Sequence, residues 1–121
     1  MPLPTYNFEF VKGETVDLTV DYKDSTGSVL DLSSGYAVTM QGRTEASSAS
    51  TLFSLSVGSG ITLSASSPNI TIRLSNTVTD AITAPTSGVF DIKVTDTAAT
   101  PDVVKFILAG KFTVYEAVTS G

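Results

Sequence analysis

Hydrophobic and polar residues alternate along most of this chain. Val16, Leu18 and Val20, for example, are separated by single polar residues. Because successive side chains of a β-strand point to opposite faces, this alternation predicts strands with one buried and one solvated face. The runs that show it cover residues 6–10, 16–23, 36–41, 53–63, 70–74 and 90–95. We expect each of these runs to contain a short strand.

The last apolar segment, residues 103–118, differs because hydrophobic residues occupy both alternating positions. One row, expected to face inward, consists of Val104, Phe106, Leu108, Phe112 and Val114, and the other contains Ile107, Ala109 and Tyr115. This pattern predicts a strand that is partly covered on its second face. Gly110, in the middle of the segment, predicts either a bulge or the close approach of another backbone.

Turn-forming residues separate the runs. Gly, Pro, Asn, Asp and Ser gather at residues 12–15, 24–27, 33–35, 58–60, 66–69, 84–88 and 97–102. These residue types favour tight turns. Residues 75–82 predict a single helical turn that crosses between sheets, with Ser75 or Asn76 as its cap and Pro85 ending it. Residues 43–50, RTEASSAS, predict an exposed loop or the end of a hairpin.

This succession of short strands predicts an all-β fold. We expect an antiparallel immunoglobulin-like β-sandwich of about seven to nine strands, with one helical turn near residues 75–82. The whole chain, residues 1–121, is expected to form a single domain, with residues 1–5 as an extended N-terminal arm and residues 119–121 as a tail. The cysteine pair and the tryptophan of antibody domains are absent. Their absence argues against the antibody family but not against the architecture.

Four aspartates in the second predicted strand and the segment after it raise the question of a metal site. Alternation places Asp17 and Asp21 on the solvated face, about 13–14 Å apart and too distant to share an ion. Asp24 begins the segment DSTG, where it can accept backbone N–H bonds while Gly27 takes a positive φ in a hairpin. Asp31 is expected near the end of the return strand. The spacing lacks the further ligands of a calcium loop, so we interpret it as a hairpin with a solvated face.

Composition disfavours several classes of function. The 121 residues include 7 basic and 12 acidic ones, giving a net charge of −5, and no cluster of Lys and Arg. We therefore expect no nucleic-acid partner and no membrane partner. Cysteine and histidine are both absent, which removes thiol nucleophiles, imidazole bases and the usual zinc ligands. No apolar run is long enough to span a bilayer, and the N-terminus lacks the pattern of a signal peptide.

No other pattern predicts a catalytic, cofactor-binding or metal site. Asp91, Asp96 and Asp102 have the carboxylates of an acid–base pair but the spacing of outward-facing and turn residues. Asn69 begins the glycosylation sequon N-I-T, which we interpret as an incidental strand pattern. The aromatic residues fall mostly on the inward alternation and are expected in the core, with Tyr115 as the exception.

The order of these motifs resembles a family of small phage virion domains. The opening segment, YNFEFVKGETVDLTVDYKDSTGSVLDLSSGYAVTMQGR, contains a strand, a K-G-E turn, an alternating strand, a D-x-x-G hairpin, L-D-L-S and a strand ending in Arg. The segments GITL, NITIRLS, SGVFDIKVTD and KFILAGKFTVYEAVT follow in the family's order. Over essentially its full length the chain is similar to the N-terminal domain of upper baseplate proteins of tailed phages and to their stand-alone relatives. The matched residues are structural, and none is a functional residue that can be carried over.

This resemblance implies a non-enzymatic structural protein of a tailed-phage virion, made in the host cytoplasm. It favours a tail or baseplate component, held by strand-edge and terminal contacts with other virion proteins and multimeric through the symmetry of the particle. Upper baseplate proteins continue into a coiled coil or a receptor-binding region, whereas this sequence ends at Gly121. We therefore expect a stand-alone building block.

The candidate partner contacts lie near the two ends of the chain. The apolar N-terminus, with Leu3, Tyr6 and Phe8, can add as a strand to a neighbouring sheet. Ile107 and Tyr115, on the second row of the last strand, form the other candidate surface.

Two further functions stay open. A capsid decoration (cement) protein is the nearest alternative, because small β-sandwich modules serve there too. A host-surface or carbohydrate-binding module is the second, and the Ser- and Thr-rich loops favour it. The absence of tryptophan and of an evident exposed aromatic pair argues against sugar binding. No mechanism suggests itself for an enzyme.

Overall fold

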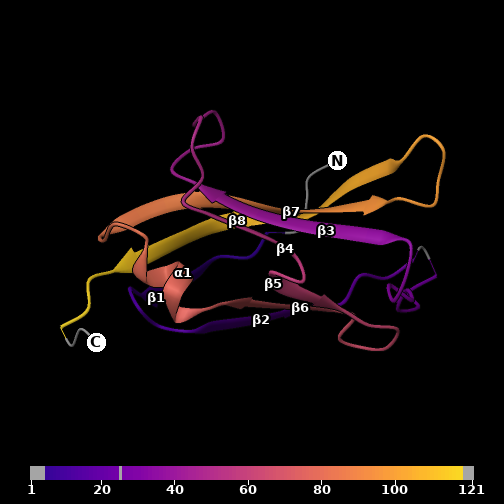
Figure 1. The fold of residues 1–121 in the computed structure, drawn as a ribbon, viewed down its shortest axis with the longest axis horizontal. Helices are drawn as coiled ribbons and strands as arrows, with labels where there is room; N and C mark the ends of the chain where they lie inside the picture. The colour runs from indigo at the N-terminus through magenta and orange to yellow at the C-terminus, as the bar shows by residue number, and fades with distance from the viewer. Residues whose placement is uncertain (1–4, 25, 119–121) are drawn as a thin grey trace.

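The computed structural model describes residues 5–24 and 26–118 and shows an all-β protein (Figure 1). Its elements in chain order are β1 (Phe8–Val11), β2 (Val16–Val20), β3 (Tyr36–Arg43), β4 (Phe53–Val57), β5 (Gly60–Leu63), β6 (Ile70–Leu74), α1 (Asn76–Asp80), β7 (Thr86–Asp96) and β8 (Val103–Tyr115). Every strand overlaps a segment whose hydrophobic pattern predicts one, although β7 begins at Thr86, inside the turn expected at residues 84–88. The eight strands found in the described residues confirm the predicted number.

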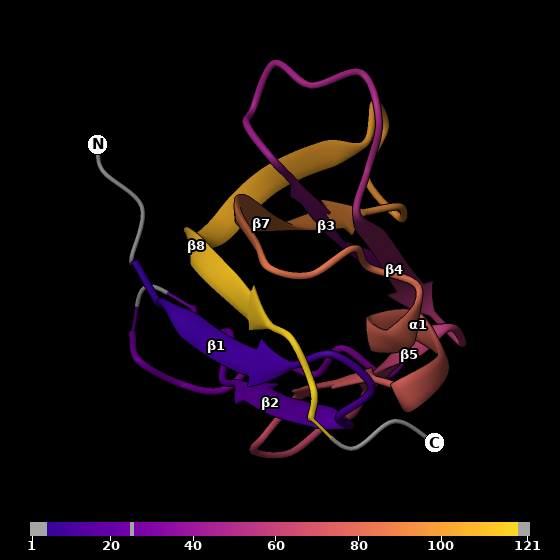
Figure 2. The ribbon, with the colours of Figure 1, turned by 90° about the vertical axis from the view of Figure 1, so that its left-hand side faces the viewer.

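The eight strands form one sheet that nearly closes on itself into a barrel, in the order β1-β8-β7-β3-β4-β5-β6-β2. The strands at the two ends of this order, β1 and β2, are consecutive in the chain and are joined by the turn at residues 12–15. In that turn Gly13 has a φ of +88°, and the Glu14 N–H donates to the Val11 carbonyl at 2.9 Å. Figure 2 shows β1 and β2 beside each other where the barrel remains open. The tight turn therefore holds the two ends of the sheet close together.

The prediction of an antiparallel immunoglobulin-like sandwich is confirmed only in part, because the fold is all-β but its single sheet is mixed. β1 runs parallel to β8, with Phe8 opposite Phe112, and β4 runs parallel to β5, with Ser56 opposite Gly60. The β4–β5 pair also joins the strands into a single sheet. Alternation along a strand reports which face is buried but not the direction of the neighbouring strand. The sequence pattern therefore contains no signal for these two parallel pairs.

The inner faces of the strands enclose one hydrophobic core. Phe112 is 1% exposed, and its ring centroid lies 5.2 Å from that of Phe53 and 6.4 Å from that of Phe10. Burying a side chain of this size stabilises the fold by about 1.5–3 kcal/mol. The buried hydrophobic residues are Phe10, Leu32, Val38, Met40, Phe53, Leu55, Ile61, Ile70, Ile72, Leu74, Ile82, Phe90, Ile92, Val94, Phe112 and Val114.

A bulge in β8 changes which of its residues face the core. Phe106 lies opposite Lys93 and Leu108 lies opposite Ile92, so Ile107 is an extra residue in the ladder. One extra residue shifts the alternation, and every side chain before the bulge then points to the other face. Phe106 consequently faces outward and is 48% exposed.

The prediction that Val104 and Phe106 share an inward row with Phe112 is therefore wrong. Gly110 does mark the close approach of another backbone, which is one of its two predicted roles. A Cβ atom at Gly110 would lie 1.8 Å from the carbonyl oxygen of Tyr6. The segment before β1 can lie against β8 at this point because residue 110 has no side chain.

The predicted helical turn is confirmed as α1, which carries the chain from β6 to β7. Ser75 is its cap, since the Ser75 Oγ accepts the Val78 N–H at 3.3 Å. The Lys12 Nζ donates to the carbonyl oxygens of Asp80 and Ile82 at the end of the helix. This contact satisfies carbonyls that a helix end leaves free and ties the β1–β2 turn to α1.

The segment after β2 keeps its predicted turn chemistry but not the predicted hairpin. The Asp24 carboxylate accepts the Thr26 N–H at 2.9 Å, and Gly27 has a φ of +89°. β2 nevertheless pairs with β6, and the expected return strand is reduced to one bridge between Lys23 and Val29. The apolar face of β2 packs better against the core beside β6 than it would in an isolated hairpin.

Asn69 holds this segment in place without a ladder. Its Oδ1 accepts the Tyr22 N–H at 2.8 Å, and its Nδ2 donates to the carbonyls of Tyr22 and Leu30 at 2.8 and 2.9 Å. The side chain of Asn69 is fully buried. The amide of the sequon is therefore used inside the fold, which agrees with the interpretation of N-I-T as an incidental strand pattern.

Candidate functional site

The outer face of β3, β7 and β8 carries a regular grid of side chains. Strand pairing arranges them in rows across the sheet, with one residue from each strand. The rows are Thr39–Lys93–Phe106, Gln41–Asp91–Ala109 and Arg43–Val89–Lys111. The residues between them, such as Met40 and Ile92, face the core and are 0% exposed. The packing of the interior therefore fixes the positions of the outer side chains.

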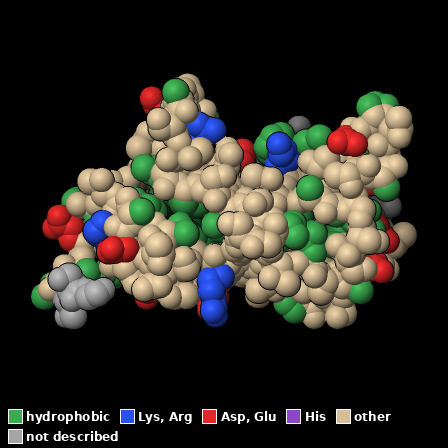
Figure 3. All heavy atoms as spheres, in the orientation of Figure 1, with side chains coloured by type: hydrophobic (Ala, Val, Ile, Leu, Met, Phe, Trp, Pro, Cys, Tyr) green, Lys and Arg blue, Asp and Glu red, His purple; other side chains and the backbone are tan. Residues whose placement is uncertain are grey.

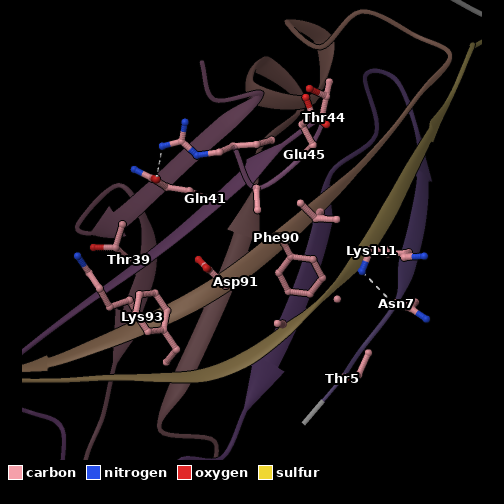
Figure 4. A pocket seen from close by; sticks show the side chains of 16 residues that line it. Thr5, Asn7, Thr39, Gln41, Thr44, Glu45, Phe90, Asp91, Lys93 and Lys111 are labelled. Carbon is pink, nitrogen blue, oxygen red and sulfur yellow. Dashed lines mark hydrogen bonds between the residues drawn. The ribbon is translucent and has the colours of Figure 1, made fainter. Parts of the chain in front are cut away.

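These rows form the floor of a groove with a volume of about 770 Å³ (Figure 4). Residues 44–46, from the loop between β3 and β4, line the groove at one side, and Thr5 and Asn7 line it at another. Figure 4 shows Asp91 in the middle of the floor, with Lys93 toward one end. A volume of several hundred Å³ is typical of small-molecule binding sites.

The bulge in β8 shapes this groove. Phe106 and Ala109 are three positions apart and would point to opposite faces of a regular strand. The extra residue, Ile107, brings both of them to the outer face. Ala109 then leaves room between the larger side chains of Phe106 and Lys111. Bulges beside functional sites re-aim side chains in this way.

The floor of the groove holds opposite charges without partners of their own. Asp91 and Lys93 are half-buried, and neither side chain makes a hydrogen bond or an ion pair with any other part of the chain that the structure describes. Arg43, by contrast, donates to the Ser48 carbonyl at 2.7 Å and to the Gln41 Oε1 at 3.0 Å. Charged groups that are partly removed from water are costly unless a partner replaces the lost hydration. A polar ligand in the groove would supply such partners.

A second exposed surface lies at the N-terminal half of β8, near the tip of the β7–β8 hairpin. Val103, Val104 and Phe106 are 45%, 49% and 48% exposed. Among the described residues, β1 pairs with β8 at Phe112–Tyr115, and Thr5, which precedes β1, forms one bridge with Ala109. No other described segment pairs with this edge of β8 at residues 103–106. Figure 3 shows hydrophobic side chains on the upper surface, over this hairpin. Among the described residues, the first half of β8 therefore pairs with β7 alone and presents an apolar sheet edge.

The structure places the predicted partner contacts in different surroundings. Leu3 lies outside the described residues. Tyr6 and Tyr115 are each 47% exposed. Phe8 and Ile107 are half-buried and pack against the core. Tyr6 and Tyr115 are thus available on the surface, whereas Phe8 and Ile107 are largely used in internal packing.

The carboxylates of the N-terminal half have separate partners. The outward position predicted for Asp17 and Asp21 is confirmed, because both are exposed. The Arg73 guanidinium donates to Asp17 at 2.6 Å, and this hydrogen bond lowers the pKa of Asp17. Hydroxyl hydrogen bonds from residues two positions further on likewise lower the pKa of Asp24 and that of Asp31. Among the described residues, no three groups of the metal-ligating types His, Cys, Asp and Glu come together to hold an ion.

The remaining aspartates that were candidates for acid–base chemistry are also dispersed. Asp91 lies in the groove, and the Asp96 carboxylate accepts the Ala98 N–H at 3.1 Å in the β7–β8 turn. Asp102 is exposed just before β8. The only other carboxylate among the groove's lining residues is that of Glu45, on the loop after β3.

Sequence pattern alone assigns Phe106 to the core and therefore misses the groove. It also treats Asp91 and Lys93 as ordinary outward residues, since nothing in the alternation shows that three outer rows form a concave floor. The available signal is the apolar character of both rows in residues 103–108. A bulge is one way in which a strand accommodates such a pattern.

A scan of the chain against protein-family models finds no match, and a search of curated proteins finds no similar sequence. Within the residues that the structure describes, no helix is long and apolar enough to cross a membrane. The function must therefore be inferred from two surfaces of the molecule, which are the groove and the edge of β8 at residues 103–106.

Proposed function

We propose that this protein is a non-enzymatic structural component of a tailed-phage virion, and that it belongs to the tail or baseplate. The observation that carries the proposal is the apolar edge of β8 at residues 103–106, which pairs only with β7 among the described residues and has Val103, Val104 and Phe106 exposed beside it. Such an edge is suited to contact with another protein. The resemblance of the motif order to the N-terminal domain of upper baseplate proteins supplies the virion context.

We propose further that the fold is a variant of the immunoglobulin-like arrangement. Strands β2, β6 and β5 form one side of the barrel, and strands β8, β7, β3 and β4 form the other. These groups correspond in chain order to the two sheets of variable-type immunoglobulin domains. The β4–β5 pair, which joins the two sides, is the departure from that arrangement.

The proposed contact is the addition of a strand from a neighbouring virion protein to the free edge of β8. Main-chain hydrogen bonds would provide affinity, and the side chains next to the edge would provide specificity. In a free protein the same edge is a site of aggregation, whereas in a particle the neighbouring subunit covers it. The symmetry of the virion would repeat the contact and make the protein multimeric.

Capsid decoration is the alternative that uses the same surface, because the head also supplies symmetric neighbours. Cryo-EM of purified virions distinguishes the two locations. We expect density for this chain in the tail or baseplate. Density on the head instead would establish decoration, and absence of the chain from mature virions would overturn both forms of the proposal.

The role of the edge is tested by the variant Val104→Lys. A lysine on an edge strand opposes strand addition, so we expect incorporation into virions, measured by quantitative mass spectrometry, to fall strongly. Val57→Lys is the matched control, because Val57 is 46% exposed on β4 and Val104 is 49% exposed on β8. Thermal unfolding of both variants shows whether the fold is intact. Equal loss of incorporation in two folded variants would contradict a specific role for the edge.

A further inference from the structure

We infer that the groove on the outer face of β3, β7 and β8 is a binding site for a neutral oligosaccharide. This inference goes beyond the proposed structural role and does not rest on it, because it concerns side chains on the outer face of β3, β7 and β8, whereas the structural role concerns the backbone edge of β8 at residues 103–106; Phe106 borders both surfaces. It concerns the isolated protein, whereas the virion proposal concerns its place in a particle.

The hydrogen-bonding groups in the middle of the floor match sugar hydroxyls, which both donate and accept. The Asp91 carboxylate only accepts and the Lys93 ammonium only donates. Neither has a side-chain partner in the described part of the chain. The Thr39 hydroxyl, which lies opposite Lys93 on β3, can do both, whereas the Gln41 amide opposite Asp91 already accepts from Arg43 and donates to Ser54. Adjacent hydroxyls of one sugar ring can therefore be satisfied together.

Phe106 supplies the apolar contact that sugar recognition also needs. Its ring is 48% exposed and lies in the row of Lys93, on the same face as Asp91. The face of an aromatic ring packs favourably against an apolar surface, and a pyranose presents such a surface through its C–H groups. The small side chain of Ala109 leaves space between this ring and Lys111. The bulge thus combines a stacking platform with unpaired polar groups in one groove.

The charge of the groove favours a neutral ligand. Its lining residues include three basic and two acidic side chains, namely Arg43, Lys93 and Lys111 against Glu45 and Asp91. A site for phosphate groups would carry a clear excess of positive charge. The near balance here suits a ligand that is polar and uncharged.

The backbone of the floor disfavours an extended peptide as the ligand. Strand addition requires a free edge, but from Val89 to Asp96 β7 is paired with both β3 and β8. Recognition on the floor must therefore come from side chains, which suits a ligand covered with hydroxyl groups. A peptide strand would instead be directed to the edge of β8, at residues 103–106.

NMR titration of the isotope-labelled full chain tests the inference. The probes are maltohexaose, cellohexaose, chitohexaose and a mannohexaose, followed by a printed array of neutral bacterial surface glycans. We expect saturable amide shifts with at least one of them, confined to residues 39–43, 89–93 and 106–111. Absence of saturable binding to every probe, or shifts in the same residues with unrelated peptides alone, would overturn the inference.

Two variants and two matched controls identify the residues that bind. We expect Phe106→Ala and Asp91→Ala each to weaken binding about tenfold or more, through loss of the ring contact and of an acceptor. Tyr115→Ala removes an aromatic ring of similar exposure, and Asp102→Ala removes an exposed carboxylate, both outside the groove. We expect both controls to bind normally. Binding that is unchanged in Phe106→Ala and Asp91→Ala would place the sugar elsewhere and refute the assignment.

Discussion

The two halves of β8 have opposite surroundings, although both are rich in hydrophobic residues. Residues 108–114 are paired with β7 on one side, the segment at residues 5–11 pairs with Ala109 and Phe112–Tyr115 on the other, and Phe112 is 1% exposed. In residues 103–106 only β7 is paired with the strand in the described structure, and Phe106 is 48% exposed. The boundary between the halves is the bulge at Ile107. Similar residue types thus serve as core in one half and as surface in the other.

The comparison teaches that the neighbours of a strand, and not its composition, decide what its hydrophobic residues do. A buried aromatic ring contributes through the area removed from water and through its ring contacts. An exposed ring on an outer face contributes little to folding and is available for binding. The bulge changes the role of the first half of β8 by turning its side chains to the other face.

Truncating one phenylalanine in each half gives the largest expected contrast. Phe112→Ala should lower the free energy of unfolding by about 3–5 kcal/mol, because it leaves a cavity among buried rings. Phe106→Ala should change it by no more than about 0.5 kcal/mol, as is usual for surface positions. Urea denaturation followed by fluorescence or circular dichroism measures both. A cost above about 2 kcal/mol for Phe106→Ala would mean that its ring packs in the interior.

A smaller effect is expected from the point where the N-terminal segment touches the buried half. Gly110→Ala places a Cβ atom 1.8 Å from the Tyr6 carbonyl oxygen, so the segment must move away. We expect a loss of about 1–3 kcal/mol, typical of overpacking. Hydrogen exchange should show faster exchange of the amides in residues 6–11.

A truncated chain provides the control for Gly110→Ala. If the clash with Tyr6 is the cause, the same substitution should cost much less in a chain that lacks residues 1–7. An equal cost in both backgrounds would point instead to the conformation of β8 itself. Denaturation of the four proteins of this cycle separates the two explanations.

The parts of the fold that follow from local pattern could be predicted from the sequence. Strand positions, the α1 turn with its Ser75 cap and the turn chemistry of Asp24 all depend on residues near one another in the chain. Gly110 predicts either a bulge or the close approach of another backbone, but its partner, Tyr6, is distant in the sequence. The parallel pairs and the pairing of β2 with β6 depend on distant segments. Alternation is the same for every choice of neighbour, so it could not reveal them.

The candidate groove could not be predicted, because it depends on one inserted residue. Without the bulge at Ile107, Phe106 would belong to the row of Phe112 and the outer face would lack its aromatic ring. Nothing in the local sequence distinguishes Ile107 from its apolar neighbours as the unpaired residue. Asp91 and Lys93 resemble any outward residues of a half-exposed strand. Only the register of β3, β7 and β8 brings them together.

The smallest predicted effect concerns the end of the buried half. The Tyr115 hydroxyl donates to Glu9 Oε2 at 2.8 Å, and this hydrogen bond to a carboxylate raises the pKa of Tyr115 above its ordinary value. Because the pKa of Tyr115 is higher in the folded than in the unfolded state, this hydrogen bond stabilises the fold fully below the unfolded-state pKa of about 10. Its contribution to the free energy of unfolding is lost as the pH rises through the folded-state pKa. We therefore expect Tyr115→Phe to be slightly less stable than the parent at pH 8, with the difference shrinking as the pH is raised above about 10. Tyr6→Phe is the matched control, because Tyr6 is equally exposed and its hydroxyl has no hydrogen-bond partner among the described residues. A difference for Tyr115→Phe that did not shrink above about pH 10 would contradict the role of the bond to Glu9. The hydroxyl would then stabilise the fold through packing, as the side chains of the buried half of β8 do.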